Sequence, residues 1–299
     1  MENLRLLLDE PLLSLQLLLD GVLIGFVFAL PALGMALVWG VMGLINVVQG
    51  ELVMLGGYVA FFLFRAGVHP LFGVPAAALC LFVLGWALYR AVVFRIVERD
   101  LFISILATFG LSILLQQLAN LLFGANLRTV ESGFGTLSLC GGAISVYTVK
   151  LISCALALAT AGALMLFLKS SRRGQAIRAS AQNARAARVI GVDIDRVYAW
   201  TFALNAAVCG AAGALVAMIW VVHPYLGLPY TIRSFMIVIA AGLGNMAGVL
   251  IAALGVGVAE NFAGFVLGAE YQSAFVFALL VAFLVARSRW LARHRRYLA

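Results

Sequence analysis

The sequence predicts an all-α polytopic membrane protein with about eight hydrophobic helices, and three observations predict it. Of the 299 residues, 65% are hydrophobic and only 11% are charged, whereas soluble domains are ~25% charged. Charge-free stretches recur along the chain at lengths that suit a spanning helix, which needs ~20 residues. These stretches do not alternate polar and apolar residues, as the strands of a membrane barrel do. The composition therefore excludes an ordinary cytosolic enzyme, a nucleic-acid-binding domain and a disordered protein.

The charge-free stretches give the order of the expected helices within one membrane domain, residues 1–299. The first lies between Asp20 and Glu51 and is 30 residues long. The others cover residues 66–89, 101–127, 197–232, 234–259 and 271–286. No soluble domain is expected, because no polar stretch is long enough to build a separate core.

The basic residues predict the orientation of these helices. Fifteen of the 20 Lys and Arg residues fall in three clusters, at 90–99, 169–196 and 287–296. Because Lys and Arg near the ends of spans are retained in the cytoplasm, we expect all three clusters, and with them the C-terminus, to be cytoplasmic. The Gly-rich loop 124–147 and the turn 223–229 then lie outside. Apolar spans separate the clusters, which argues against a nucleic-acid-binding face.

Two regions are too short for the number of full membrane crossings that the predicted topology requires of them. Residues 234–286 must cross from outside to inside in 53 residues, whereas three full crossings need ~60; residues 11–64 pose the same problem. The interruptions are Gly40, Gly43, Gly50, Gly56 and Gly57 in the first region and Gly242, Gly244 and Gly248 in the second. Non-helical backbone at membrane depth occurs only inside protein or beside a polar cavity. We therefore expect half-helices or re-entrant segments beside a substrate path; the alternative is that these glycines only allow close helix packing.

Polar side chains in and near the broken regions are the candidates for that path. They are Asn46, Gln49, Glu51, Thr108, Gln116, Asn245 and Glu260. Ionisable groups at membrane depth are costly and usually face a protein interior or a cavity. For Glu51 the alternative is a structural role at a helix start, where a carboxylate satisfies free backbone N–H groups. For Glu260 a structural and a functional role are equally open.

The longest basic stretch, 169–196, predicts a helix that contacts a partner protein. Alanines recur in it at helical spacings and glycines mark its ends. Small residues make a helix narrow enough to enter a groove, and flanking arginines can pair with acidic groups there. The residues expected to make the contact are Gly174, Ala176, Arg178, Ala179, Asn183, Ala187 and Gly191. The alternative is a basic loop that only orients the chain, but the stretch is longer than orientation requires.

The same stretch resembles the cytoplasmic coupling loop of the branched-chain amino-acid permeases of ABC importers. It follows the family pattern RxGxAxRAxAxNxxAAxxxGI from Arg172, with Val192 in place of the isoleucine. Three further segments are similar to family patterns and occur in the same order: GLINVVQGE at 43–51 to GxINFAHGE, 107–116 to ATFGLSxxLQ, and 241–260 to GGxGSxxGAxxGGxxxGxxE. The set covers nearly the whole chain. The departures lie in the two broken regions, and they leave the exact cargo open.

The resemblance implies a transport subunit, not an enzyme, in the bacterial cytoplasmic (inner) membrane. It would form the path for branched-chain or related hydrophobic amino acids, although the family also includes permeases for urea, short amides and aromatic acids. The implied partners are a homologous second permease, two cytoplasmic ABC ATPases, a soluble substrate-binding protein and membrane lipid, with no nucleic acid.

No cofactor is expected on this chain itself. It has only two lysines and no GxxxxGK[ST] phosphate loop or metal-ligand motif, so ATP and Mg would bind the partner ATPases. A rival of another class is an ion-coupled secondary transporter that uses Glu51 or Glu260 as the coupling carboxylate. Such a carrier would not need the segment 169–196.

Overall fold

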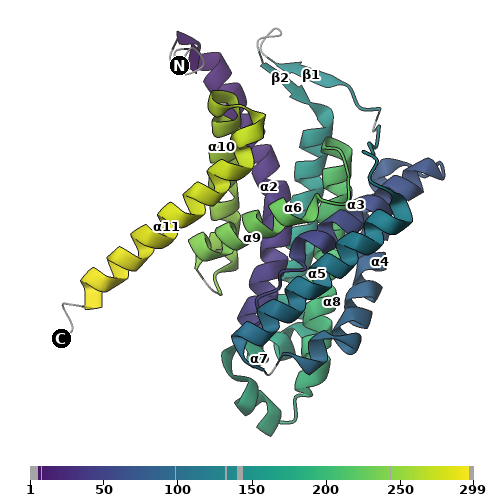
Figure 1. Cartoon of the computed structure of the whole chain (residues 1–299), viewed down its shortest axis with the longest axis vertical. Coiled ribbons are helices and arrows are strands. Elements are labelled where there is room, and N and C mark those ends of the chain that lie inside the picture. The colour runs from purple at the N-terminus through teal and green to yellow at the C-terminus, as the bar shows by residue number, and fades with distance from the viewer. Residues whose placement is uncertain are drawn as a thin grey trace.

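The chain folds into a single bundle of helices, seen in a computed structural model that describes residues 6–7, 9–97, 99–131, 133–139, 144–242 and 244–295 (Figure 1). The elements, in chain order, are α2 (Pro11–Met42), α3 (Gln49–Arg65), α4 (Pro70–Ala91), η1 (Val93–Arg95), α5 (Leu101–Phe123), β1 (Thr136–Leu139), β2 (Ile144–Tyr147), α6 (Thr148–Ser170), α7 (Arg172–Val189), α8 (Ile194–Ile219), α9 (Gly227–Ala241), α10 (Met246–Leu267), η3 (Ala269–Tyr271) and α11 (Gln272–Arg295).

Six of these helices are long and apolar enough to cross a membrane, namely α2, α4 (which is continuous with η1), α5, α6, α8 and α10. Shorter apolar segments, 227–241 and 274–285, lie in α9 and α11, and α3 adds a 17-residue helix. The chain is thus an all-α polytopic membrane protein, and its helix count is close to the expected eight.

The core of the bundle is built on α2 and α8. More than three quarters of the most apolar window of each is buried, whereas α4, α5, α6 and α10 are mostly exposed along theirs. Small residues explain the position of α8, which carries the run AAVCGAAGA and packs against α3 and α4. A Cβ at Gly213 would overlap the Val53 carbonyl of α3. Close approach of this kind is how membrane helices gain packing contacts.

The structure confirms one interruption of the helical backbone in each of the two regions where the sequence predicted a break. The first separates α2 from α3 after Gly43, whose φ of 63° is in the left-handed region. The second separates α9 from α10 at Gly242 and Gly244, with φ of 82° and 83°, because glycine adopts such φ values without steric cost.

The other glycines of the two broken regions lie inside helices, and close packing accounts for Gly50, Gly56 and Gly57. Gly40 instead meets no neighbouring atom and lines the inner pocket. Gly50 faces the backbone of Gly227, and Gly56 faces that of Gly210. One sequence interpretation was wrong. The turn expected at 223–229 ends earlier, because α9 already begins at Gly227. Arg233, taken as the boundary of a span, therefore lies within a helix.

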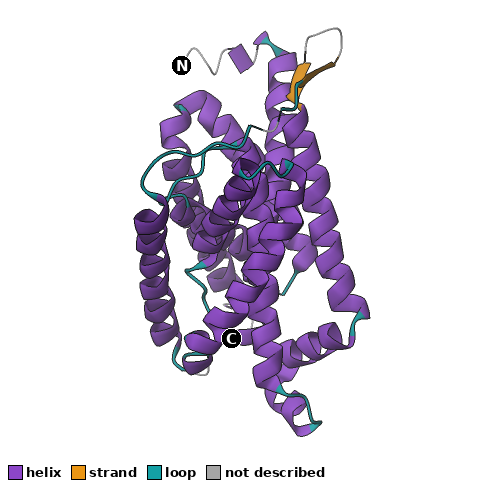
Figure 2. Ribbon diagram, turned by 90° about the vertical axis from the view of Figure 1, so that its right-hand side faces the viewer, coloured by secondary structure: helices purple, strands orange, loops and turns teal. Residues whose placement is uncertain are grey.

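Two ends of the bundle can be distinguished. The N-terminus and the β1–β2 hairpin lie at one end, and α7 lies at the other (Figures 1 and 2). The last turn of α4 with η1 meets the end of α7, since Arg95 and Arg188 line one cavity with Asp193. α11 runs from the hairpin end toward the α7 end (Figure 1). The basic clusters at 90–99 and 169–196 are therefore carried by elements at the α7 end, and the side of the membrane on which they lie stays a prediction.

The hairpin itself was not anticipated in an all-α chain. β1 and β2 pair antiparallel, with Thr136 opposite Tyr147 and Leu139 opposite Ile144. Alternating polar and apolar residues in TLSL, and β-branched residues in ISVY, favour short strands. These strands sit in the loop 124–147, outside the spanning helices.

Candidate functional site

Two pockets lie beside α2, at opposite ends of the bundle. The outer pocket, at the hairpin end, has a volume of about 550 Å³ and reaches Ile24 and Phe28 of α2. The inner pocket, at the α7 end, has a volume of about 490 Å³ and reaches Ala36 and Val41. Both pockets are also lined by α6 and by residues of or next to α10.

The segment of α2 between the two pockets is fully packed. Residues 29–35 are all buried, and at 1.5 Å per residue this stretch is about 10 Å long. Packed protein along α2 therefore separates the two cavities.

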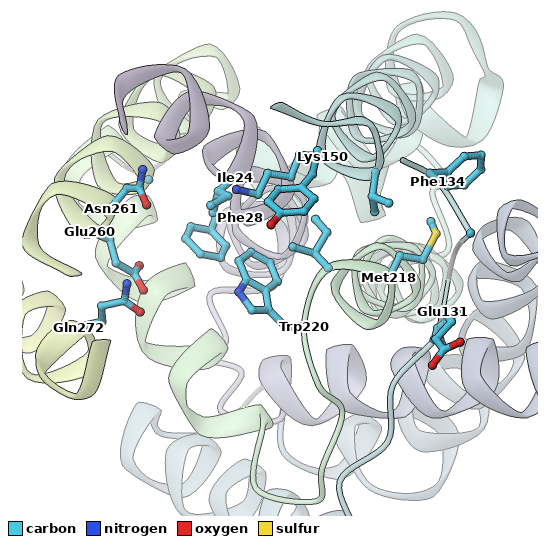
Figure 3. Close-up of a pocket in the computed structure, with 16 residues that line it drawn as sticks. Ile24, Phe28, Glu131, Phe134, Lys150, Met218, Trp220, Glu260, Asn261 and Gln272 are labelled. Atoms are coloured by element: carbon cyan, nitrogen blue, oxygen red, sulfur yellow. The ribbon is translucent and has the colours of Figure 1, made fainter. Parts of the chain in front are cut away.

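The outer pocket has one polar and one apolar wall. Glu260 and Asn261 of α10 and Gln272 of α11 lie on one side, opposite Phe28 and Trp220 (Figure 3). The Phe28 and Trp220 rings stack with centroids 6.1 Å apart. A small molecule with a polar head and an apolar tail suits this division.

Glu260 is held by an ion pair with Arg233 of α9. Arg233 Nε lies 3.0 Å from Oε1 and 2.8 Å from Oε2 of Glu260, and Arg233 Nη2 also contacts Oε1. Both side chains are buried, with 12% and 6% of their surface exposed. The guanidinium also lies over the rings of Phe28 and Tyr230, at 5.0 and 5.2 Å from their centroids. Arg233 thereby compensates a carboxylate that would be costly to bury alone.

A second ion pair stands at the same end of the molecule. Lys150 Nζ of α6 lies 2.9 Å from Asp20 Oδ1 of α2, and Lys150 lines the outer pocket. Its side chain is only 17% exposed. The pocket is thus bordered by the paired groups Glu260 and Lys150, and Glu131 adds a second carboxylate to its lining.

Asn46 and Gln49 lie at the α2–α3 break, but neither lines either pocket. Asn46 Nδ2 donates to Gln49 Oε1 at 3.1 Å, and Asn46 Oδ1 accepts from the Val48 N–H. Gln49 Nε2 donates to Pro31 O at 2.6 Å and to Asn205 Oδ1 at 2.9 Å. Both side chains are fully buried. In this conformation their hydrogen bonds tie the break to α2 and α8.

Glu51 and Thr108 lie near the same break. Thr108 Oγ1 of α5 donates to Ile45 O at 3.2 Å, so it holds the non-helical segment in place. Ser112 Oγ donates to Glu51 Oε1 at 3.2 Å. Within the described residues, Glu51 Oε2 has no hydrogen-bond partner, although Glu51 lies in the first turn of α3, where a carboxylate is favoured.

Gln116 and Asn245 complete the predicted path residues, and the structure does not bring them together. Gln116 is half-buried on α5, away from both pockets. Asn245 caps α10, with its Oδ1 accepting from the Gly248 N–H at 2.9 Å, and its neighbours Gly244 and Met246 line the inner pocket. Of the predicted path residues, Glu260 is thus the one that lines a pocket directly.

The basic stretch forms α7, a polar helix outside the spans. Ser171 caps it by accepting from the Gly174 N–H at 2.8 Å. Asn183 breaks the helical geometry with φ −159° and ψ 100°, and its Oδ1 accepts from the Ala186 N–H, so a last short turn begins there. Gly191, with φ 92°, ends the segment.

Of the alanines of α7, Ala176, Ala179 and Ala187 face the bundle, whereas Ala181 and Ala186 are exposed. Ala187 is 3% exposed, and Ala176 and Ala179 pack against the core. The outward surface instead carries Arg178 and, at the end of the helix, the apolar pair Val189 and Ile190, which are 87% and 77% exposed. Any contact with a partner in this conformation falls to these exposed side chains.

α7 also forms part of the inner pocket. Ile177, Arg178, Ala181 and Gln182 line it together with α2 and α6. A displacement of α7 would therefore change the shape of this pocket directly. The sequence pattern gave no sign of this, since it shows which residues are small or charged but not which face packs inward.

Sequence reasoning also missed Arg233 as a site residue. A signal was present: Arg233 and Glu260 are the only charged residues between Arg196 and Glu270, and lone opposite charges at membrane depth tend to pair. Among the described residues, no group of three or more His, Cys, Asp or Glu side chains is placed to hold a metal ion.

A membrane bundle with pockets at two ends and a polar helix outside its spans suits a membrane transport protein. The chain belongs to the family described as branched-chain amino acid transport system, permease component, whose profile matches residues 17–284. It is thus a multi-pass membrane transport subunit and not an enzyme.

Curated relatives cover nearly the whole chain. The chain is 30% identical to the high-affinity branched-chain amino acid transport system permease protein LivH of Salmonella typhimurium, over 93% of this chain and 94% of that protein. It is 31% identical to the corresponding protein BraD of Pseudomonas aeruginosa, over 91% and 94%. A probable branched-chain amino acid transport permease of Methanocaldococcus jannaschii is 24% identical over 91% and 88%. No solved structure matches the chain significantly.

Proposed function

We propose that this chain is the membrane subunit of an ATP-driven (ABC) importer and forms the path for branched-chain or related hydrophobic amino acids. The observation that supports this most is the position of α7. The helix is polar, lies at the basic end of the bundle and lines the inner pocket with Ile177 and Arg178. A partner that pulls on α7 would reshape the inner mouth of the path.

The path runs along α2, between α6 and α10, from the outer to the inner pocket. Cargo enters at the hairpin end and leaves beside Gly244 and Met246 at the break between α9 and α10. The closed segment 29–35 must part for passage, and the break supplies the backbone freedom for that movement.

The partners in this proposal are a homologous second permease, two cytoplasmic ATPases that hold ATP and Mg, and a soluble substrate-binding protein. The three basic clusters face the cytoplasm, and the outer pocket faces the binding protein. Arg178, Val189 and Ile190 give the ATPase contact a charged and an apolar part. Homologues named for branched-chain amino acid transport support these amino acids as the cargo, rather than urea or short amides.

The test is leucine uptake into vesicles that contain the permease pair and the ATPases, with binding protein supplied on the outer-face side. Uptake should require ATP, ATPases and binding protein together. Leucine uptake that proceeds without the ATPases and follows a proton or sodium gradient would overturn the proposal. It would favour an ion-coupled carrier, for which the partly unpartnered Glu51 carboxylate is the candidate coupling group.

A further inference from the structure

The outer pocket carries a charged group whose arrangement suggests a specific ligand. Glu260 lines the pocket, whereas Arg233 does not; Arg233 instead lines a smaller cavity on the other side, with Ile232 and Val276. The carboxylate therefore reaches the open space while it stays paired with Arg233. A carboxylate has about four lone-pair positions, and the three contacts from Arg233 leave Glu260 able to accept from a ligand in the pocket.

A further acceptor stands beside Glu260 on the same wall. Asn261 Nδ2 donates to Leu17 O at 2.7 Å, which orients the amide and leaves its Oδ1 as an acceptor. Figure 3 shows Glu260 and Asn261 together on this side of the pocket. Two acceptors, one of them anionic, suit a primary ammonium group, which has three donors and no acceptor.

A cation borders the same space. Lys150 reaches the pocket from α6 and is held by Asp20, so its ammonium is positioned before any ligand arrives. Its three donors exceed what Asp20 alone satisfies. Between the charged groups, Phe28 and Trp220 provide an apolar wall.

We propose that this pocket binds the zwitterionic head of an amino acid with an apolar side chain, with Glu260 accepting from the ammonium and Lys150 donating to the carboxylate. Arg233 is a positioning residue for Glu260. The inference rests on the proposed function and deepens it, because it assigns the head-group contacts of the path to three residues.

The charge balance of the pocket explains why such a site selects its cargo. Glu260 and Lys150 each already have a partner, and Glu131 also lines the pocket. A zwitterion is neutral overall, so its binding leaves the net charge of the pocket unchanged. A cargo with an additional charged side chain would bury that charge without a partner. Urea or a short amide lacks the two charged ends and would leave the head-group contacts unmade.

The first experiment locates the cargo directly. The assembled importer in vesicles receives a photoreactive diazirine analogue of leucine, itself a zwitterion with an apolar side chain, loaded on the binding protein. Illumination should label residues of the outer-pocket wall such as Phe28, Met218 and Trp220, and excess leucine should suppress the labelling. Labelling confined to other surfaces, in an importer that takes up leucine, would overturn the inference.

The second experiment separates head-group recognition from a merely structural ion pair. Replacing both partners, Arg233→Met with Glu260→Leu, leaves no unpaired buried charge, so the fold should survive. Leucine uptake should fall about tenfold or more, with photolabelling of the wall lost. The charge swap, Arg233→Glu with Glu260→Arg, keeps a link between α9 and α10 and should also lose uptake, because a cation then faces the ammonium.

Controls keep the outcomes distinct. Arg65→Met removes an exposed cation at the end of α3, away from the outer pocket and from α7, and should leave uptake unchanged. Full uptake by the charge swap, or by the double apolar variant, would show that the pair is only structural and would overturn the inference while the proposed function stands. Absence of ATP-dependent leucine uptake by the parent importer would overturn the proposed function, and this inference with it.

Discussion

Gln49 Nε2 lies 2.9 Å from Asn205 Oδ1, and this contact joins the first turn of α3 to the middle of α8. The same nitrogen also lies 2.6 Å from Pro31 O of α2 and 3.1 Å from Cys209 Sγ. Three helices therefore meet at one buried amide, directly after the break that follows α2. The position favours a role in fixing the break rather than in contacting cargo.

Loss of one partner of this contact should destabilise the protein. Gln49→Leu removes the Gln49 donor of Asn205 Oδ1 and the acceptor of Asn46 Nδ2. Asn205→Leu removes an acceptor of Gln49, so each variant should cost about 1–3 kcal/mol. The double variant should cost less than the sum of the two, because neither polar group is then left alone. Thermal unfolding in detergent measures the three differences. Single variants as stable as the parent would show that water replaces the contact.

This expectation departs from the one that the sequence supports for Gln49. The broken region suggests that its polar side chains face a path and alter transport more than assembly. The structure instead surrounds Gln49 with protein, since its exposed fraction is 0%. Gln49→Ala distinguishes the two interpretations. Reduced assembly would favour a structural role, whereas normal assembly with altered uptake would favour a role in the path.

Close contact between α3 and α8 should make Gly213 intolerant of any side chain. A Cβ there would overlap the Val53 carbonyl and approach Gly57 N to 2.7 Å. Gly213→Val should therefore force α3 and α8 apart and cost more than the ~1–3 kcal/mol of ordinary overpacking.

Gly162→Ala on α6 is the matched control for this substitution. A Cβ at Gly162 meets nothing within 4 Å, and alanine is favoured over glycine in a helix by ~1 kcal/mol. We expect equal or higher yield and thermal stability for Gly162→Ala, and little folded protein for Gly213→Val, by size-exclusion chromatography. Comparable elution of the two would contradict the packing described for α8.

The sequence predicted the positions of the long spans because their cause is local. Bilayer thickness sets the length of an apolar helix, so the charge-free stretch 101–127 contains α5 and the stretch 66–89 covers most of α4. Glycine likewise marks the breaks at Gly43 and Gly242 through its own φ preference.

The candidate site depends on contacts between distant segments, and these are not visible in local patterns. Glu260 was identified by its charge at membrane depth, but its partner Arg233 lies 27 residues earlier on another helix. The inward face of α7 was missed for the same reason. Ala179 is small in any context, and only the fold determines that it packs against its own bundle.

The orientation of the chain in the membrane should follow its basic clusters. Ser171→Cys, at the start of α7, should react with an impermeant thiol reagent only after the inner face is exposed. Ser138→Cys in β1, an exposed position at the opposite end, should react from outside intact cells. Both variants need a background without Cys80, Cys140, Cys154 and Cys209. Labelling of Ser171→Cys from outside would place α7 on the wrong side for an ATPase and overturn the topology.

The exposed end of α7 should couple the permease to its ATPases. Val189 and Ile190 are the most exposed apolar residues of this helix, and aspartate at both positions would place charge in an apolar contact. Charge reversal in Arg178→Glu would remove a cation that can pair with acidic groups of a partner. Neither change touches a membrane span, so membrane levels of the permease should match the parent. We expect weaker co-purification of the ATPases and ATP hydrolysis that no longer drives uptake. The affinity for the ATPases should fall about tenfold or more if the contact contributes 1.4 kcal/mol or more.

Arg90→Glu, which reverses an exposed cation at the end of α4, is the control for charge reversal at the same end of the bundle and should couple normally. If Val189→Asp with Ile190→Asp and Arg178→Glu all couple as the parent does, α7 serves only to orient the chain, and the proposed link between ATP hydrolysis and the inner pocket loses its physical basis.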